Sequence, residues 1–217
     1  MVITTSPKEN LVTDTWVKGS WEEFLALADN LDYEKGKFYY YRECLRIETA
    51  DVGSLHGRQH SIVSGIISYY ATLKNFRFIE LRNSSFCHPN LVEFQPDLSY
   101  YIGADFELPP PTDSPINISE FKLPALVVEI GVFSLEDDLG KKRLMYEQFG
   151  VKEYWAVDAN NDDVIAFFIA DKGSKQVEQS LVLEGLELAV VEEALKRSHD
   201  CDDTAVYNWF IEAISQV

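Results

Sequence analysis

The sequence predicts a mixed α/β (α+β) fold, in which helices flank a mixed central sheet. Residues 124–158 follow the pattern strand, helix, strand. Along the chain, the expected order is helix, two strands, helix, two strands, loop, strand, helix, two strands, which is typical of helices packed on one sheet. The 217 residues are 46% hydrophobic, enough for one sizeable core. We therefore expect residues 1–217 to form a single domain.

The first half of the chain contains clear helix and strand signals. Ser20 and Glu23 have the spacing of a capping box, so a helix is expected over 21–28. Aromatic and β-branched runs over 37–49 predict an antiparallel pair of strands. A helix is expected over 56–73, followed by strands over 76–81 and 94–102. The expected inward-facing residues of the 56–73 helix are Ile62, Ile66, Ile67 and Tyr70.

The centre of the chain predicts a buried strand followed by a helix. Residues 125–130 are apolar except for Glu129, as expected for a strand that is buried on both faces. Ser134, with Asp137 three residues later, predicts the helix start, and Gly150 predicts its end. A second strand is expected over 154–158.

The remaining segments complete the expected fold. Residues 103–124 contain five prolines and are expected to form a long loop. Further strands are expected over 164–170 and 177–183. The patterns at 190–197 and 204–214 predict two C-terminal helices.

Composition limits the classes of function. The 19 Lys and Arg against 36 Asp and Glu give a net charge of −17, so nucleic acid could bind only at a local basic patch. Residues 141–143 and Lys152 are expected to supply a basic rim. The three cysteines form no CxxC pair, which indicates a reducing compartment and no zinc site. The first ten residues resemble no leader and no apolar run is long enough to cross a bilayer, so we expect a cytoplasmic protein without membrane contact.

Two acidic residues on separate strands form the strongest candidate site. Asp97 follows Pro96 near a strand start, whereas Glu129 lies near a strand end. If these strands are neighbours, the carboxylates converge, and either one takes up a proton or a cation lies between them. Because Mg²⁺ accepts one or two carboxylates plus waters, the pair predicts a Mg²⁺ (or Mn²⁺) site.

A polar stripe follows Glu129 on the expected helix. Asp138, Lys142 and Tyr146 are spaced at i, i+4 and i+8 and so share one face. This spacing makes Lys142 a candidate neighbour of a metal-bound water. The alternative is that Asp138 and Lys142 form an ordinary solvated salt bridge, which contributes little. Glu129 has few structural uses in an apolar strand, so we expect it to be functional.

Taken together, these residues resemble a large bacterial family of restriction-endonuclease-like proteins in the PD-(D/E)XK nuclease superfamily. The resemblance covers about residues 21–170, and its most specific parts are QPDLSYYI and DDLGKKRLMYEQFGVKEYW. It implies a restriction-endonuclease-like fold, a Mg²⁺ site and phosphodiester hydrolysis. By position, Asp97 and Glu129 match the acidic pair, and Glu34 matches a glutamate after the first helix. His56 matches a histidine that opens the second helix.

The sequence departs from the superfamily motif at one position. D/E-x-K would place a lysine at position 131, but this chain has Gly131. The family resembled generally lacks that lysine, and the resemblance implies that Lys142 takes over its role.

Two functions remain open at this level. The first is a metal-dependent endonuclease acting on nucleic acid, with DNA the expected substrate, in which Asp97, Glu129, Lys142 and Glu34 are catalytic. The second is a catalytically inactive nuclease fold that serves as a binding or assembly module, and a homodimer is expected in this case.

Overall fold

The computed structural model describes residues 13–49, 53–132 and 134–215. The chain divides into two compact units. The first unit comprises Met1–Asp51 and Cys87–Gln95, and the second comprises Val52–Phe86 and Pro96–Val217. The division into compact units does not test the single domain expected over 1–217, which stays a prediction. The first ten residues, which were expected to resemble no leader, lie outside the described ranges. No helix within those ranges is long and apolar enough to cross a membrane.

The first unit combines a sheet with one helix. Its strands follow the order β1-β3-β2-β6-β5. Helix α1 begins at the expected capping box, since the Glu23 amide donates to Ser20 Oγ at 3.2 Å and the Ser20 amide donates to Glu23 Oε2 at 2.7 Å. Phe24 of this helix packs with Tyr40 and Leu45 of the sheet. The elements are β1 (Val17–Lys18), α1 (Trp21–Ala28), η1 (Leu31–Tyr33), β2 (Lys37–Tyr41), β3 (Cys44–Glu48), β5 (Phe86–His88) and β6 (Val92–Phe94).

The second unit is built on a six-stranded mixed sheet. The strand order is β12-β11-β10-β9-β7-β4. Strands β9 and β10 are parallel, and the other neighbours are antiparallel. This arrangement confirms the predicted mixed sheet. The strands are β4 (Phe78–Arg82), β7 (Leu98–Ile102), β9 (Leu126–Gly131), β10 (Glu153–Asp158), β11 (Asp163–Ala170) and β12 (Gly173–Val177), and β8 (Ile116–Asn117) lies in the proline-containing loop.

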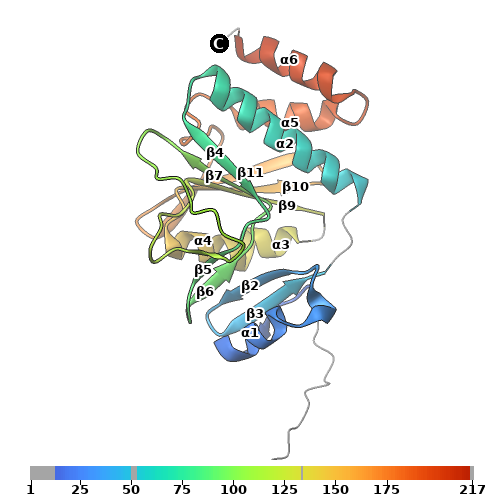
Figure 1. Cartoon of the computed structure of the whole chain (residues 1–217). Coiled ribbons are helices and arrows are strands. Elements are labelled where there is room, and N and C mark those ends of the chain that lie inside the picture. The colour runs from blue at the N-terminus through green and yellow to red at the C-terminus, as the bar shows by residue number, and fades with distance from the viewer. Residues whose placement is uncertain (1–12, 50–52, 133, 216–217) are drawn as a thin grey trace, which may run out of the picture. The chain divides into compact units, whose positions relative to one another are not determined.

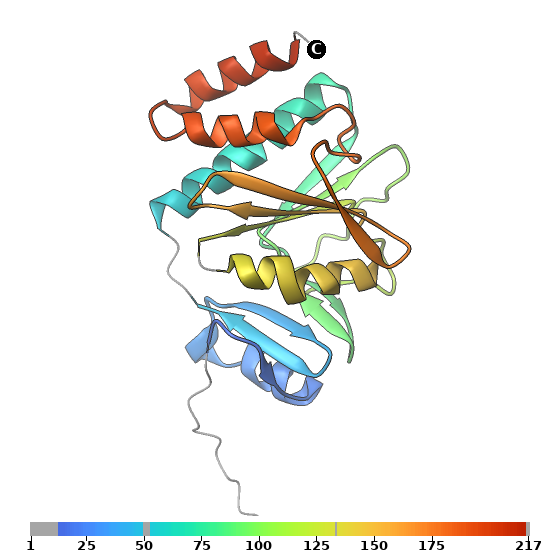
Figure 2. The same ribbon diagram turned by 180° about the vertical axis from the view of Figure 1, so that it is seen from behind.

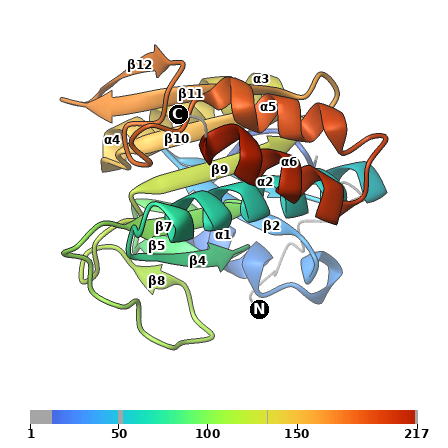
Figure 3. The same cartoon turned by 90° about the horizontal axis from the view of Figure 1, so that it is seen from above.

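Helices cover both faces of this sheet (Figure 1). Helices α2 (Ser54–Leu73), α5 (Leu188–Arg197) and α6 (Asp203–Ser215) lie on one face, and Figure 3 shows the three grouped together. Helices α3 (Leu135–Asp137) and α4 (Arg143–Phe149) lie on the other face, as the reverse view also shows (Figure 2). The four residues of α2 that were expected to face inward are all buried in the main core.

Two predicted strands differ from the structure. The strand expected over 94–102 is two strands, β6 and β7, because Pro96 interrupts the backbone pairing between them. In the strand predicted over 177–183, only Val177 lies in a strand, as the last residue of β12, and residues 178–183 are not a strand. The buried Glu153 carboxylate accepts hydrogen bonds from the amides of Leu181 and Val182, and these amides are therefore not available to a ladder. The edge strand is instead β12, whose polar, largely exposed residues show no apolar alternation.

The predicted helix over 134–150 is also interrupted. The segment Asp138–Lys142 (η2) joins α3 to α4 across a kink at Gly140, whose φ of −100° and ψ of −105° are not helical. Ser134 occupies the predicted N-cap position, but its side chain makes no capping hydrogen bond, because its hydroxyl donates to Asp138 Oδ2 at 2.7 Å. Gly150 ends α4 in the left-handed conformation, as predicted.

A buried glutamate in the first unit links stability to pH. Burial raises the pKa of Glu93 to about 7, against a smaller effect of the hydrogen bond from Cys87. The folded protein therefore holds a proton on Glu93 that the unfolded chain releases near its ordinary pKa of 4.5. Stability from this group is present below pH 4.5 and is lost as pH rises to 7.

We expect Glu93→Gln to stabilise the protein above pH 7, by on the order of 3 kcal/mol, because a neutral amide replaces a buried charge. At pH 4.5 the two proteins should differ little. Urea unfolding at both pH values measures the difference. An equal effect of the substitution at both pH values would contradict this account.

Candidate active site

Asp97 and Glu129 lie opposite each other on neighbouring strands. In the antiparallel register of β7 and β9, Leu98 pairs with Val128, so one further step places Asp97 across from Glu129. The Ile130 amide donates to Asp97 Oδ2 at 2.8 Å. Asp97 is 3% exposed and Glu129 is 1% exposed. The structure thus brings two buried carboxylates to one end of two adjacent strands.

The side chain of Glu129 points away from the main core. Alternate residues of β9, such as Val128 and Ile130, belong to the core that includes α2. Glu129 therefore faces the layer of α3 and α4. There its Oε1 accepts a hydrogen bond of 2.6 Å from the Tyr146 hydroxyl, and its Oε2 lies 3.5 Å from Lys142 Nζ.

Lys142 is a buried cation between two carboxylates. Its side chain is 1% exposed, and its Nζ lies 3.0 Å from Asp138 Oδ1 as well as near Glu129. The solvated salt bridge considered as the alternative is therefore wrong, since both partners are buried. Taking these charges out of water costs several kcal/mol per ion, and they are stable only together.

The kinked turn Asp138–Lys142 is the local structure that positions Lys142. Both ends of this turn, Asp138 and Lys142, are buried, and their charged groups meet across it. The backbone carbonyl of Asp138 also accepts a hydrogen bond from the Tyr154 hydroxyl of β10 at 3.0 Å. Gly140 is the sequence signal that could have indicated this interruption.

Gly131 leaves the space that this arrangement needs. A Cβ at position 131 would lie 2.6 Å from Ser134 Oγ and 2.7 Å from Asp138 Oδ2. A lysine at this position would break the hydrogen bond by which Ser134 holds the Asp138 carboxylate. The departure from the D/E-x-K pattern therefore has a steric reason within the fold.

Two histidines of α2 flank Asp97. His56 Nε2 lies 3.5 Å from Asp97 Oδ1, and His60 Nε2 lies 3.3 Å from the Asp97 backbone oxygen. Burial lowers the pKa of His60, although the Asp97 charge opposes this effect. His60 is therefore a neutral ring near pH 7 that donates to the carbonyl. His56, which was expected to support the site, thus lies close to the Asp97 carboxylate.

The remaining predicted residue, Glu34, lies in the first unit. It is exposed at the end of η1. Because Asp97 and Glu129 belong to the second unit, the participation of Glu34 in their site stays a prediction.

The donor set fits a hard divalent cation. Both carboxylates present oxygen ligands, which Mg²⁺ prefers. Within the described residues, no group of three or more His, Cys, Asp or Glu side chains could hold a metal ion. An ion held by Asp97 and Glu129 would thus keep several waters, as Mg²⁺ usually does.

Two polar contacts of this region were not predicted from the sequence, and one lysine was predicted on the surface but is buried. The hydroxyls of Ser134 and Tyr154 both bind Asp138, and the four-residue spacing from Ser134 was the available signal. The predicted basic rim is wrong for Lys142, which is buried. Arg143 is also engaged, since it donates to Leu139 and Ser174 and lies over the Phe167 ring.

Comparison with known proteins agrees with the fold described above. The family model described as "Uma2: Putative restriction endonuclease" matches residues 21–202, which extends the predicted resemblance beyond residue 170. Among solved structures, the chain is similar to a protein from Anabaena variabilis ATCC 29413 described as "a putative nuclease belonging to DUF820". The TM-score is 0.56 at 15% sequence identity, over 81% of this chain and 98% of that one. No curated protein matches the sequence.

The structural similarity identifies the fold as that of a restriction-endonuclease-like nuclease, and the family model spans most of the chain. The chain therefore belongs to the Uma2 family of restriction-endonuclease-like proteins.

Proposed function

We propose that this protein is a metal-dependent nuclease of the PD-(D/E)XK type that hydrolyses phosphodiester bonds in nucleic acid, with DNA as the expected substrate. The observation that carries the proposal is the buried group formed by Asp97, Glu129 and Lys142 at one end of β7 and β9. Two carboxylates and one ammonium group match the chemical requirements of this reaction. The family to which the chain belongs supports the same reaction class.

Asp97 and Glu129 are the proposed ligands of Mg²⁺ or Mn²⁺. When bound, such an ion would polarise a phosphoryl oxygen and lower the pKa of a bound water. The chain's own contribution is to fix the two carboxylates. The Ile130 amide holds Asp97, while the Tyr146 hydroxyl holds Glu129. Such supporting contacts orient ligands and tune their basicity.

Lys142 is the proposed replacement for the lysine of the D/E-x-K motif. Its ammonium group is already directed at Glu129 Oε2, so it can stabilise negative charge that develops on the phosphate or orient the attacking water. Asp138 holds the ammonium group in place from the other side. Asp138 is thus a positioning residue, and His56 and Glu34 are proposed as further supporting groups.

A catalytically inactive binding module is the second candidate function. The net charge of −17 favours it, because such a chain repels nucleic acid. The contact between Lys142 and Glu129 also favours it, since the ammonium group already neutralises one proposed metal ligand. Metal titration distinguishes the two functions, because an inactive module with a vestigial site should bind no divalent ion.

Cleavage of nucleic acid is the first test of the proposed function. We expect the wild type, with Mg²⁺ or Mn²⁺, to cleave at least one member of a panel of plasmid DNA, linear duplex, single-stranded DNA and RNA. Glu129→Gln and Asp97→Asn keep the shape of each side chain but remove its charge. Each should lose divalent-ion binding in calorimetry and reduce cleavage by at least about 100-fold.

Glu136→Ala is the matched control, because Glu136 is an exposed carboxylate of the neighbouring helix α3. It should bind metal and cleave like the wild type. Unchanged Mn²⁺ affinity in both Glu129→Gln and Asp97→Asn would eliminate the proposed metal site. Absence of both metal binding and cleavage in the wild type would favour the module.

The second prediction separates catalysis from structure at Lys142. Lys142→Met should retain metal binding within about threefold but lose cleavage. It should also destabilise the protein by about 3–5 kcal/mol, because Asp138 and Glu129 lose their buried counter-ion. Thermal unfolding and metal titration measure these two effects separately.

Lys142→Arg keeps the positive charge and is the companion variant if Lys142→Met does not fold. Its planar fork should fit the compact site poorly, so we expect a folded protein with strongly reduced cleavage. Full cleavage by folded Lys142→Met would show that Lys142 is only structural, and full cleavage by Lys142→Arg would show that the positive charge alone is needed.

The third prediction tests the steric role of Gly131. Gly131→Ala should destabilise the protein by about 1–3 kcal/mol, because the new Cβ crowds Ser134 and Asp138. Gly57→Ala in α2 is the control, since a Cβ there meets no described atom within 4 Å apart from its chain neighbours and the nearby backbone of its own helix. That control should stabilise the helix by roughly 0.5–1 kcal/mol. Equal effects of the two substitutions in urea unfolding would refute the steric explanation.

A further inference from the structure

A polar pocket lies at the other end of β7 and β9, away from Asp97 and Glu129. Those two residues lie at the start of β7 and near the end of β9, whereas the pocket is lined by Ile102 at the end of β7 and by Ala125, which precedes β9. Its volume is about 540 Å³, within the range of roughly 300–1,000 Å³ typical of small-molecule sites. At about 3.3 Å per residue, the five residues of β7 separate the two places by roughly 15 Å.

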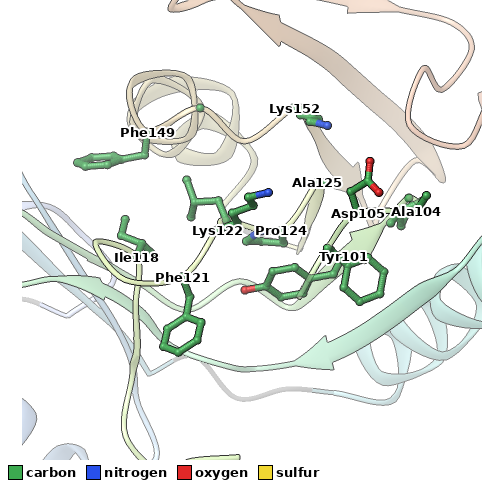
Figure 4. Close-up of a pocket in the computed structure, with 15 residues that line it drawn as sticks. Tyr101, Ala104, Asp105, Ile118, Phe121, Lys122, Pro124, Ala125, Phe149 and Lys152 are labelled. Atoms are coloured by element: carbon green, nitrogen blue, oxygen red, sulfur yellow. The ribbon is translucent and has the colours of Figure 1, made fainter. Parts of the chain in front are cut away.

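Aromatic side chains form much of the pocket wall. Tyr101, Phe106, Phe121 and Phe149 all line it, and the rings of Tyr101 and Phe106 have centroids 5.9 Å apart. In Figure 4 the Tyr101 ring lies close to Pro124 and its hydroxyl points toward Phe121. Rings arranged in this way suit the stacking of a planar aromatic ligand.

The charged residues of the pocket are two lysines and one aspartate. Lys122 and Lys152 are both exposed lining residues, and Figure 4 shows their amino groups on the same side of the Tyr101 ring. Asp105 is the acidic lining residue. A chain with a net charge of −17 thus carries a locally cationic pocket, which favours an anionic ligand group.

A buried hydroxyl in this pocket lacks a protein partner. Tyr101 is 3% exposed, and its hydroxyl has no hydrogen-bond partner among the residues that the structure describes. Burial raises the pKa of this phenol to about 12, so it is a neutral donor and acceptor. Buried polar groups are nearly always paired. A ligand group that reaches this hydroxyl would supply the missing partner.

The rim of the pocket is held in place before any ligand binds. Arg77 donates to the carbonyls of Ala104 and Phe106, and its guanidinium lies 3.9 Å from the centroid of the Phe106 ring. Gly103, at φ +121°, makes the turn that brings this rim beside Arg77, whose carbonyl accepts from the Gly103 amide. A preformed rim lowers the ordering cost of binding.

We propose that this pocket binds a nucleotide, with its base stacked on the aromatic wall and its phosphate held by Lys122 and Lys152. Asp105 is placed to accept hydrogen bonds from the sugar hydroxyls or the exocyclic amine of the base. The nucleotide is either free in solution or the phosphorylated end of a strand. The pocket's own chemistry carries this inference, which does not depend on nuclease activity.

Calorimetric titration of the full chain in the presence of EDTA tests the proposal without cleavage. The probes are adenosine monophosphate, adenosine, inorganic phosphate and a four-nucleotide DNA with or without a 5′-phosphate. We expect adenosine monophosphate or the phosphorylated DNA to bind at least tenfold more tightly than adenosine or phosphate alone. Preference for the mononucleotide identifies a free ligand, and preference for the phosphorylated DNA identifies a strand end.

The double variant Lys122→Ala/Lys152→Ala should weaken this binding at least tenfold, and Tyr101→Phe should weaken it about threefold. The matched control is Lys172→Ala/Lys175→Ala, which removes one exposed lysine of the β11–β12 turn and one of β12 and should change nothing. Failure of every nucleotide probe to bind the wild type at millimolar concentration would overturn the proposal. Equal binding by the Lys122→Ala/Lys152→Ala variant would also overturn it, and neither result bears on metal binding at Asp97 and Glu129.

Discussion

The buried ammonium group of Lys142 is the charge on which the surrounding structure depends. Glu129 and Asp138 are each about 1% exposed, and two carboxylates in such a place would repel each other and lose their solvation. Lys142 reaches both of them, at 3.5 and 3.0 Å. Because none of the three charges is stable there alone, the local backbone must keep them together.

The backbone features around Lys142 serve this constraint. The kinked turn between α3 and α4 carries Asp138 and Lys142 at its ends, and Gly131 leaves room for the hydrogen bond between Ser134 and Asp138. The parallel pair β9 and β10 places the intervening helices against the sheet face that carries Glu129. Tyr146 then completes the contacts of Glu129 from α4. An ammonium group thus reaches Glu129 without a lysine in the strand itself.

Periodicity and composition were sufficient wherever a segment's own side chains decide its structure. The capping box of α1, the inward face of α2 and the glycine end of α4 were predicted because each depends on neighbours within a few residues. Prediction failed where a residue that is distant in the sequence decides the structure of a segment. The segment 177–183 looked like a strand, but Glu153 binds two of its amides. Strand β12 was missed because a polar edge strand has no apolar alternation.

The sequence by itself determined the class of fold and the identity of the candidate residues. A lone glutamate in an apolar strand, and a polar stripe after it, were enough to single out Glu129, Asp138, Lys142 and Tyr146. Only the tertiary structure decided the state of those residues. Strand register places Asp97 opposite Glu129, and burial turns an apparently ordinary i, i+4 ion pair into a three-charge cluster. Register and burial depend on contacts between distant segments, whereas spacing along the chain records only which side chains are available.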